Sequence, residues 1–361
     1  MSKIVISGYY GFANAGDEAM LTAIIKSLRK LEPEVEIKVI SGNPELTAKT
    51  HQVKSLHRFD LFELLPALAG CDLLVSGGGS LLQDVTSKRS LCYYLAIVAL
   101  AKLFSKKVML FAQGIGPIRS SFMRKLTKQV TSKADLITVR DKDSLYELRR
   151  LGVPESKVER TADAVFTLPQ VSTEQGRSIL ERFDVPQGKM LVAVSVRNWQ
   201  EDDSYLLELA KAADALARKR KAHIVLLPLQ YPIDVEACRR VQQFMDCKEN
   251  STVLETGCDT EGFLSLIGNF DLLIGMRLHA LIFAAVMKVP FVAVSYDPKI
   301  DGFVKDISGV SAGHVNNLQA QQVVAAAGQA LLLQGDTRDM LQKLREKSEL
   351  NALKAMELIK K

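Results

Sequence analysis

The segment Asp271-Leu-Leu-Ile-Gly-Met-Arg-Leu-His279, followed by the apolar run 280–287, decides the fold that we expect for this chain. It predicts a buried strand, a turn at Gly275 and then a helix. Open α/β sheets bind ligands at the carboxyl ends of their strands, and Arg277 and His279 fall at such an end. Arginine is a permanent cation suited to phosphate or carboxylate, and histidine exchanges protons near neutral pH. The segment therefore predicts an enzyme that acts on an anionic small molecule.

Short β-branched runs alternate with amphipathic stretches on both sides of this segment, which indicates parallel sheets covered by helices on both faces. In the first half we expect strands at residues 3–7, 36–40, 73–76, 108–112, 136–139 and 158–160. In the second half we expect strands at residues 191–196, 222–227, 252–254, 272–274 and 291–294. Helices are expected between the strands, and two more should close the chain, at residues 318–332 and 337–359.

A stretch with prolines and glycine, residues 167–189, separates the two halves. We therefore expect an N-terminal domain of residues 1–168 and a C-terminal domain of residues 169–361, with the last helix a candidate to pack back on the first domain. The fold class that we predict is α/β, with two doubly wound Rossmann-like domains facing across a cleft. This is the arrangement of the two-domain glycosyltransferase fold called GT-B.

The composition is that of a soluble globular protein. The chain has 361 residues, of which 47% are hydrophobic and 24% charged, and no apolar run is long enough to span a bilayer. The formal net charge of +6 is modest, and its densest cluster, residues 218–221, ends a helical pattern, so nucleic acid is not an expected partner. Five scattered cysteines lack metal-binding spacing, which predicts reduced thiols, a cytoplasmic location and no metal site.

Glycine-rich loops follow three strands of the first half. The first loop, residues 8–18, leads into a helix, and its Asn14 and Asp17 could accept hydrogen bonds from substrate hydroxyls. Asp17 has a second interpretation, as the helix N-cap. The next loop contains three consecutive glycines, of which Gly78 and Gly79 are expected to line a substrate face. The third loop, residues 113–119, again has glycines after a strand and ends in a cation, Arg119.

One further loop of the first half carries charged residues directly after a strand. There Arg140 either pairs with nearby carboxylates or faces a ligand, and Asp141 or Asp143 caps the helix that follows.

Cations follow several predicted strands in both halves. Arg119, Arg197, Arg277 and Lys299 all fall just beyond a strand end, and we predict that they bind an anion. The only tryptophan, Trp199, lies beside one of them and either packs or stacks on a sugar. His279 is the candidate catalytic acid or base. Nucleophile-elbow, P-loop and zinc motifs are absent from the sequence, which argues against covalent serine chemistry.

These loops together carry a resemblance to the polysaccharide pyruvyltransferase family, and most closely to the CsaB-type enzymes of bacterial cell-wall polymer synthesis. The matching segments span nearly the whole chain in the family's order: Gly8-Tyr-Tyr-Gly-Phe-Ala-Asn-Ala-Gly-Asp-Glu18, Val75-Ser-Gly-Gly-Gly-Ser80, Gln113-Gly-Ile-Gly-Pro117, Val139-Arg-Asp141 and Gly275-Met-Arg-Leu-His279.

The resemblance implies a GT-B-like fold and the transfer of pyruvate, as a ketal, from phosphoenolpyruvate (PEP) to a sugar. For the CsaB-type members it implies a 4,6-ketal on β-linked N-acetylmannosamine, carried on a polyprenyl-diphosphate lipid. The product polymer is then bound by S-layer homology domains. No cofactor or metal is implied, because PEP is the donor substrate. The lipid-linked acceptor would bring the enzyme to the cytoplasmic face of the membrane.

Two other functions share these features. A nucleotide-sugar glycosyltransferase would have the same fold and basic residues, but it usually carries a carboxylate for the nucleotide ribose in its second domain. A non-catalytic protein that binds anionic glycans would use the arginines and leave His279 without a function.

Overall fold

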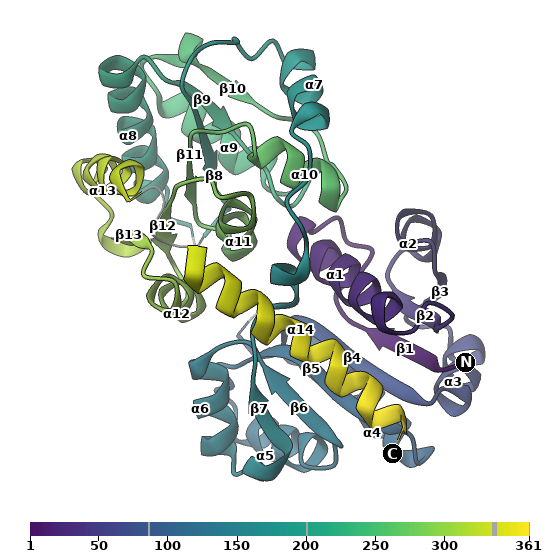
Figure 1. Ribbon diagram of the computed structural model, residues 1–361. Helices are drawn as coiled ribbons and strands as arrows, with labels where there is room; N and C mark the ends of the chain where they lie inside the picture. The colour runs from purple at the N-terminus through teal and green to yellow at the C-terminus, as the bar shows by residue number, and fades with distance from the viewer. Residues whose placement is uncertain (86, 200, 334–337, 361) are drawn as a thin grey trace. The chain divides into compact units, whose positions relative to one another are not determined.

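The computed structural model describes residues 1–85, 87–199, 201–333 and 338–360, and the chain divides into two compact units (Figure 1). The first unit comprises Met1–Phe12, Asp17–Leu168 and Gln342–Lys361. The second unit comprises Ala13–Gly16 and Pro169–Leu341. Both units are therefore discontinuous in sequence, since a short segment near the N-terminus belongs to the second unit and the C-terminal helix belongs to the first.

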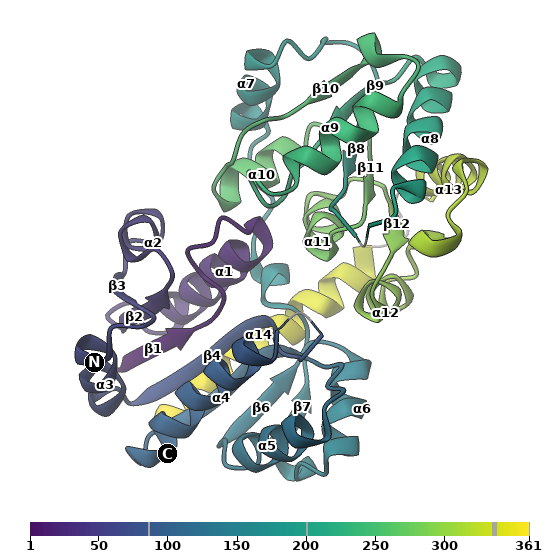
Figure 2. The ribbon, with the colours of Figure 1, turned by 180° about the vertical axis from the view of Figure 1, so that it is seen from behind.

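A parallel sheet forms the centre of the first unit, and within the described residues it has the order β3-β2-β1-β4-β5-β6-β7. Its strands are β1 (Lys3–Ser7), β2 (Glu36–Ser41), β3 (Lys54–His57), β4 (Leu73–Leu82), β5 (Lys107–Ile115), β6 (Leu136–Val139) and β7 (Val158–Arg160). The helices are α1 (Ala15–Leu31), α2 (Pro44–His51), α3 (Leu61–Gly70), α4 (Lys88–Leu103), α5 (Ser121–Thr131), α6 (Lys142–Leu151) and α14 (Arg338–Lys360). α1 and α14 cover one face of the sheet and α4 covers the other (Figures 1 and 2).

The second unit repeats this plan with the strand order β10-β9-β8-β11-β12-β13 in the described part of the chain. Its strands are β8 (Leu191–Ser195), β9 (His223–Leu226), β10 (Ser251–Val253), β11 (Leu272–Gly275), β12 (Phe291–Ser295) and β13 (Val310–His314). Its helices are α7 (Glu174–Arg182), α8 (Ser204–Arg220), α9 (Val235–Phe244), α10 (Thr260–Ile267), α11 (Leu278–Met287), α12 (Pro298–Asp306) and α13 (Ala320–Leu332). α8 packs against α9 and α13, and α10 packs against α7 and α11.

The predicted fold class, two parallel α/β Rossmann-like units, is confirmed. In each sheet the strand order reverses at one point, between β1 and β4 in the first unit and between β8 and β11 in the second. Ligands of open parallel sheets bind beyond the carboxyl ends of the strands at such a reversal. This topology directs attention to the loops after these four strands.

Helix α14 is joined to the first unit by buried polar contacts. Ser348 Oγ donates a hydrogen bond to the Asp163 carbonyl at 2.8 Å, and Thr161 Oγ1 donates to Asn351 Oδ1 at 2.8 Å. Asn351 Nδ2 donates in turn to the Ala162 carbonyl at 3.2 Å. Because Ser348 and Asn351 are buried, leaving them without partners would be costly, so these bonds fix the helix in one position. Thr337, the predicted start of this helix, lies outside the described residues.

Strands β4 and β5 are longer than predicted, which corrects our placement of two glycine loops. β4 continues from Ser76 to Leu82, and β5 continues from Ala112 to Ile115. The glycines 77–79 and Gly114 therefore lie in strands, whereas Gly116 is the first residue after β5. Irregular register near Gly79 lets the strand bend without ending.

Four elements were not predicted from the sequence, namely β3, β13, α2 and α12. The two strands lie at sheet edges, where few side chains are buried and the hydrophobic pattern is weak. Each of the two helices starts with a proline in its first turn, after a side chain that caps it: Asn43 before α2 and Asp297 before α12. Such cap and proline signals are short, and we predicted no helix in either segment.

Candidate functional site

The loop after β1 is held by a chain of polar contacts in the first unit. The Gly11 amide donates to Glu18 Oε1 at 2.8 Å, and Glu18 Oε2 lies 3.0 Å from His51 Nε2. His51, which is buried, also lies 3.3 Å from Thr22 Oγ1 through Nδ1. Gly11 has φ +80°, and a Cβ there would lie 2.4 Å from the Asn43 amide nitrogen, so only glycine fits. Glu18 and His51, for which we predicted no function, thus position this loop.

Asp17 lies against the backbone of the glycine segment in β4. Its Oδ1 atom would be 3.0 Å from a Cβ at Gly79, and the Met20 sulfur would be 2.7 Å from a Cβ at Gly78. The glycines therefore allow α1 to approach β4 closely, which is a packing function that the sequence did not suggest. Asp17 is in the first turn of α1, two residues after its start, and is not the N-cap. The proposed roles of Asp17, Gly78 and Gly79 in binding an acceptor stay predictions.

Arg140 pairs with carboxylates in the interior of the first unit. Its Nη1 atom lies 2.7 Å from Asp163 Oδ2, Nε lies 3.6 Å from Asp141 Oδ2, and Nη2 donates to Ser80 Oγ at 3.1 Å. Burial lowers the pKa of Arg140, but these carboxylates outweigh it and hold the pKa above its ordinary value. Of the two alternatives for Arg140, pairing is therefore the observed one. Asp141 also caps α6 through a bond from the Ser144 amide, which confirms the predicted cap.

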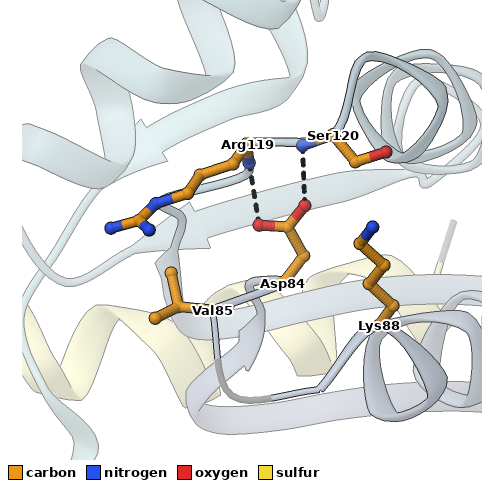
Figure 3. Close-up of a pocket in the computed structure, with 5 residues that line it drawn as sticks. All are labelled: Asp84, Val85, Lys88, Arg119 and Ser120. Atoms are coloured by element: carbon orange, nitrogen blue, oxygen red, sulfur yellow. Dashed lines mark hydrogen bonds between the residues drawn. The ribbon is translucent and has the colours of Figure 1, made fainter.

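Arg119 lines an open pocket of about 370 Å³ in the first unit (Figure 3). The pocket is also lined by Asp84, Val85, Lys88 and Ser120. The Asp84 carboxylate accepts hydrogen bonds from the amides of Arg119 and Ser120, at 2.7 and 2.8 Å, and the Arg119 guanidinium points away from Lys88. The pocket has two cations and one carboxylate already satisfied by the backbone, so a small anion is the ligand that its charge favours.

Asp84→Asn is expected to destabilise the protein by about 1–3 kcal/mol at neutral pH, because an amide cannot accept both backbone bonds as a charged carboxylate does. Burial alone would raise the pKa of Asp84, but the hydrogen bonds from the backbone amides of Arg119 and Ser120 lower it by more, so the pKa is below its usual value. The stabilisation of the fold by the charged Asp84 carboxylate is therefore present above the pKa that Asp84 has in the unfolded chain. It is lost as the pH falls through the pKa of Asp84 in the folded protein. Urea unfolding of both forms between neutral and acid pH measures this; a difference independent of pH would contradict it.

In the second unit, His279 contacts the segment Ala13–Gly16. The Ala15 amide donates to the Leu229 carbonyl at 3.0 Å, and Asn14 forms an antiparallel bridge with Gln230. A Cβ at Gly16 would lie 2.1 Å from His279 Nδ1, so glycine is required where the segment crosses the imidazole ring. His279 itself is in the first turn of α11, directly beyond β11. The ring is thus positioned by a segment that is about 260 residues away in the sequence.

Arg277 is paired with a buried carboxylate. Its Nε atom donates to Asp234 Oδ2 at 2.9 Å, its Nη2 atom donates to Asp234 Oδ1, and Nη2 also donates to Gln230 Oε1 at 3.1 Å. The Asp234 side chain is only 1% exposed and also accepts from the Gln230 amide. The charge of Arg277 is therefore compensated within the protein by Asp234. The predicted anion binding by Arg277 would use only the guanidinium N–H groups that do not bond to Asp234 or Gln230.

Arg197 lies in an aromatic environment beyond β8. Its Nη1 atom donates to the Tyr296 hydroxyl at 3.0 Å, and its guanidinium is 5.1 Å from the Tyr296 ring and 5.9 Å from the Trp199 ring. The two rings contact each other with centroids 4.6 Å apart. The Tyr205 hydroxyl holds this loop by donating to the Arg197 carbonyl and accepting from the Trp199 amide. No ion pair with a carboxylate is found for Arg197 among the described residues, so its charge is available to an anion.

The structure therefore distributes the predicted residues between the units. In the second unit, Arg197, Arg277 and His279 lie beyond β8 and β11, and Asn14 forms its bridge with Gln230 in the loop after β9. Lys299 is the second residue of the helix after β12, with its Nζ atom 3.9 Å from Asp297 Oδ2. In the first unit, Asp17, Gly78, Gly79 and Arg119 lie near the ends of β1, β4 and β5. We did not predict a function for Gln230, Asp234 or Tyr296, because nothing in the local sequence indicates their partners Arg277 and Arg197.

Two general features of the described residues complete this description. Within residues 1–85, 87–199, 201–333 and 338–360, no group of three or more His, Cys, Asp or Glu side chains is arranged to hold a metal ion. In the same ranges, no helix combines the length and the apolar character that crossing a bilayer requires.

Solved structures with a similar fold include an epimerase and a glycosyltransferase. The UDP-GlcNAc 2-epimerase of Methanocaldococcus jannaschii has a TM-score of 0.70 at 13% identity, over 99% of this chain and 100% of that one. MnaA of S. aureus with UDP gives 0.67 at 13% identity, over 99% and 95%. A glycosyltransferase of Rickettsia africae ESF-5 gives 0.61 at 14% identity, over 99% and 95%. At these identities the similarity shows the GT-B-like fold and does not show the activity.

Sequence comparison identifies the family. The amylovoran biosynthesis protein AmsJ of Erwinia amylovora is 21% identical over 383 residues, which is 90% of each chain. The family model for polysaccharide pyruvyl transferase matches residues 14–298, a span that includes most of the strand-end residues described above. The chain therefore belongs to the polysaccharide pyruvyl transferase family, and it is a transferase.

Proposed function

We propose that this transferase uses PEP as its donor and forms a cyclic pyruvate ketal on a sugar of a cell-wall polymer precursor. The family supports pyruvyl transfer onto polysaccharide, so neither the glycosyltransferase nor the non-catalytic interpretation is retained. The choice of donor rests on Arg197, which has no carboxylate partner among the described residues. Arg197 follows β8, and His279 follows the neighbouring strand β11. PEP has a phosphate and a carboxylate, and both require positive charge.

The cations of the second unit would share the binding of PEP. Arg197 would contribute its uncompensated charge, and Lys299 would add an ammonium at the start of α12. Arg277 would contribute the N–H groups that its pair with Asp234 leaves available, and that pair would keep the guanidinium in a fixed orientation. Arg119, which lies in the first unit, would bind an anionic group from its own pocket.

The reaction needs one acid/base group, for which we propose His279. Protonation of the PEP methylene carbon makes a methyl group and leaves an oxocarbenium-like centre at C2. One sugar hydroxyl attacks C2 and loses its proton to the base, the C2–O bond to phosphate breaks, and the second hydroxyl closes the ring. One hydroxyl hydrogen thus ends in the methyl group and the other leaves with phosphate, so the atoms balance. A positioned acid/base contributes about 10²–10⁴-fold to such proton transfers.

For the acceptor we propose the 4- and 6-hydroxyls of a β-linked N-acetylmannosamine on a polyprenyl-diphosphate carrier. Asn14 and Asp17 would accept hydrogen bonds from the sugar, next to the backbone of Gly78 and Gly79 in the case of Asp17. A lipid-linked acceptor would bring the enzyme to the cytoplasmic face of the membrane as a peripheral protein. The pyruvylated polymer would then serve as a ligand for S-layer homology domains.

The direct test measures phosphate release from PEP with and without a β-linked N-acetylmannosamine glycoside, and the mass of the product. We expect acceptor-dependent phosphate release and a mass gain of one pyruvate ketal. Release with another sugar would retain the donor and correct the acceptor. Absence of release from PEP with every glycan tested, in a folded protein, would refute the proposed donor.

Arg197→Ala is expected to raise KM for PEP about tenfold or more, because it removes a charge-assisted contact of about 1.5–3 kcal/mol. Steady-state kinetics at varied PEP concentration measure this. Arg197→Lys tests the planar guanidinium and should recover only part of the loss. Arg218→Ala, at an exposed ion pair with Asp246, is the matched control and should behave as wild type. An unchanged KM for PEP in Arg197→Ala would exclude Arg197 from the donor site.

A further inference from the structure

We propose that the first unit contains a second glycan subsite, a stack formed by Tyr9, Phe12, Arg58 and Phe59, which binds sugar residues of the acceptor polysaccharide beyond the residue that is modified. This inference rests on the transfer of pyruvyl groups to a polysaccharide. It does not depend on which sugar receives the ketal.

The four side chains form consecutive layers. The rings of Tyr9 and Phe12 stack with centroids 4.3 Å apart and an interplanar angle of 14°. The Arg58 guanidinium lies 5.0 Å from the Phe12 ring and 4.5 Å from the Phe59 ring. Tyr93 of α4 closes one side, because its ring is 5.6 Å from the guanidinium and meets Phe59 edge-on at 5.9 Å. The stack therefore joins the loop after β1, the loop after β3 and helix α4.

Phe59 is exposed although it is held in place. Phe59 is 61% exposed. Its ring is held by the Arg58 guanidinium on one face and by the Tyr93 ring at its edge. The backbone below it is also fixed, because the Arg58 amide donates to the Ser41 carbonyl at 3.0 Å and the Tyr93 hydroxyl donates to the Arg58 carbonyl at 3.3 Å. A preorganised aromatic ring that faces solvent loses little conformational entropy when a ligand stacks on it.

The chemistry of the stack fits a sugar chain. Sugar rings present C–H faces that pack on aromatic rings, and polar groups around their edges that need hydrogen bonds. The Arg58 guanidinium has no hydrogen bond or ion pair with another side chain among the described residues, so its N–H groups can bind hydroxyls or an acidic substituent of the glycan. An aromatic surface next to an available cation therefore favours a polar, partly anionic ligand over a purely apolar one.

The position of the stack also fits an extended acceptor. It lies beyond the carboxyl ends of β1 and β3, on the ligand-binding edge of the first sheet. Tyr9 and Phe12 belong to the same loop as Asn14 and lie a few residues before Asp17, the proposed acceptor ligands. A polysaccharide that presents one residue for pyruvylation has neighbouring residues, and the stack would bind these.

The test compares two acceptors of different length: a single β-N-acetylmannosaminide and a longer oligosaccharide that ends in the same residue. Phe59→Ala is expected to raise KM for the oligosaccharide about tenfold more than KM for the short glycoside, which corresponds to about 1.4 kcal/mol. Phe59→Tyr keeps the ring and should restore the wild-type ratio. Phe62→Ala is the matched control, because Phe62 is 93% exposed, lies nearby in the sequence and takes no part in the stack.

Saturation-transfer NMR with the oligosaccharide alone gives a readout that does not require turnover. We expect contacts to the non-terminal sugars in the wild type and in Phe62→Ala, and their loss in Phe59→Ala. Binding without any pyruvyl transfer would retain the subsite and refute the activity, whereas transfer with an unchanged KM ratio would refute the subsite. Weaker binding of Phe59→Ala and Phe62→Ala alike to vesicles with anionic phospholipid, with oligosaccharide binding intact, would reassign the surface to the membrane and overturn the proposal.

Discussion

Replacing His279 with alanine is expected to lower kcat for pyruvyl transfer by about 10²–10⁴-fold, because the variant lacks a group to donate and accept the proton. The ring lies in the first turn of α11 and contacts Gly16, so alanine removes packing as well as chemistry. His279→Gln separates the two effects, since glutamine keeps volume and hydrogen bonding but does not transfer protons near neutral pH. We expect kcat to fall to a similar extent in both variants, and His279→Gln to unfold near the wild-type temperature.

His314→Ala provides the control for His279. His314 is exposed at the end of β13 and accepts a hydrogen bond from the Asn316 amide, remote in sequence from the residues proposed for catalysis. Single-turnover measurement of the three variants distinguishes loss of chemistry from loss of binding. Near-normal kcat in folded His279→Gln would remove His279 from the mechanism.

Arg277→Ala is expected to have the largest effect on stability, about 3–5 kcal/mol, because it leaves the Asp234 carboxylate buried without its counter-ion. The Asp234 side chain is 1% exposed and that of Arg277 is 11% exposed, so solvent cannot replace the lost partner. Urea unfolding gives the free energy directly. An unchanged free energy of unfolding would mean that the two side chains are not paired in solution.

A paired variant separates the structural function of Arg277 from anion binding. Arg277→Gln combined with Asp234→Asn replaces the ion pair by neutral groups that can still bond, and should recover most of the stability. If Arg277 also binds PEP, the double variant will be stable and will keep a raised KM for PEP. Recovery of both stability and KM would show that Arg277 acts only on the structure.

The sequence predicted features that depend on neighbouring residues. The strand–turn–helix segment around Gly275 has a strong apolar pattern, and the helix cap at Asp141 depends on an amide three residues away. Both were confirmed for that reason. The fold class also followed, because alternating strands and helices leave few arrangements other than parallel sheets.

The sequence failed where a side chain's partner is distant along the chain. Nothing near Arg277 indicates that Asp234, 43 residues earlier, neutralises it. The glycines led to a related error. A glycine indicates that another group approaches the backbone closely, but it does not indicate whether that group is a ligand or another part of the protein. At Gly78 it is Met20 and at Gly16 it is the ring of His279, whereas we had expected substrate at the first of these positions.

The contribution of α14 to the first unit has a consequence for biosynthesis. During translation, residues 169–341 are complete while Thr161 and Asp163 still lack Ser348 and Asn351, their buried partners. The second unit can therefore fold first on the ribosome, although most of the first unit is synthesised earlier. Until residues 342–360 emerge, the segment 161–163 lacks the hydrogen bonds from α14, so the first unit cannot yet reach its final structure.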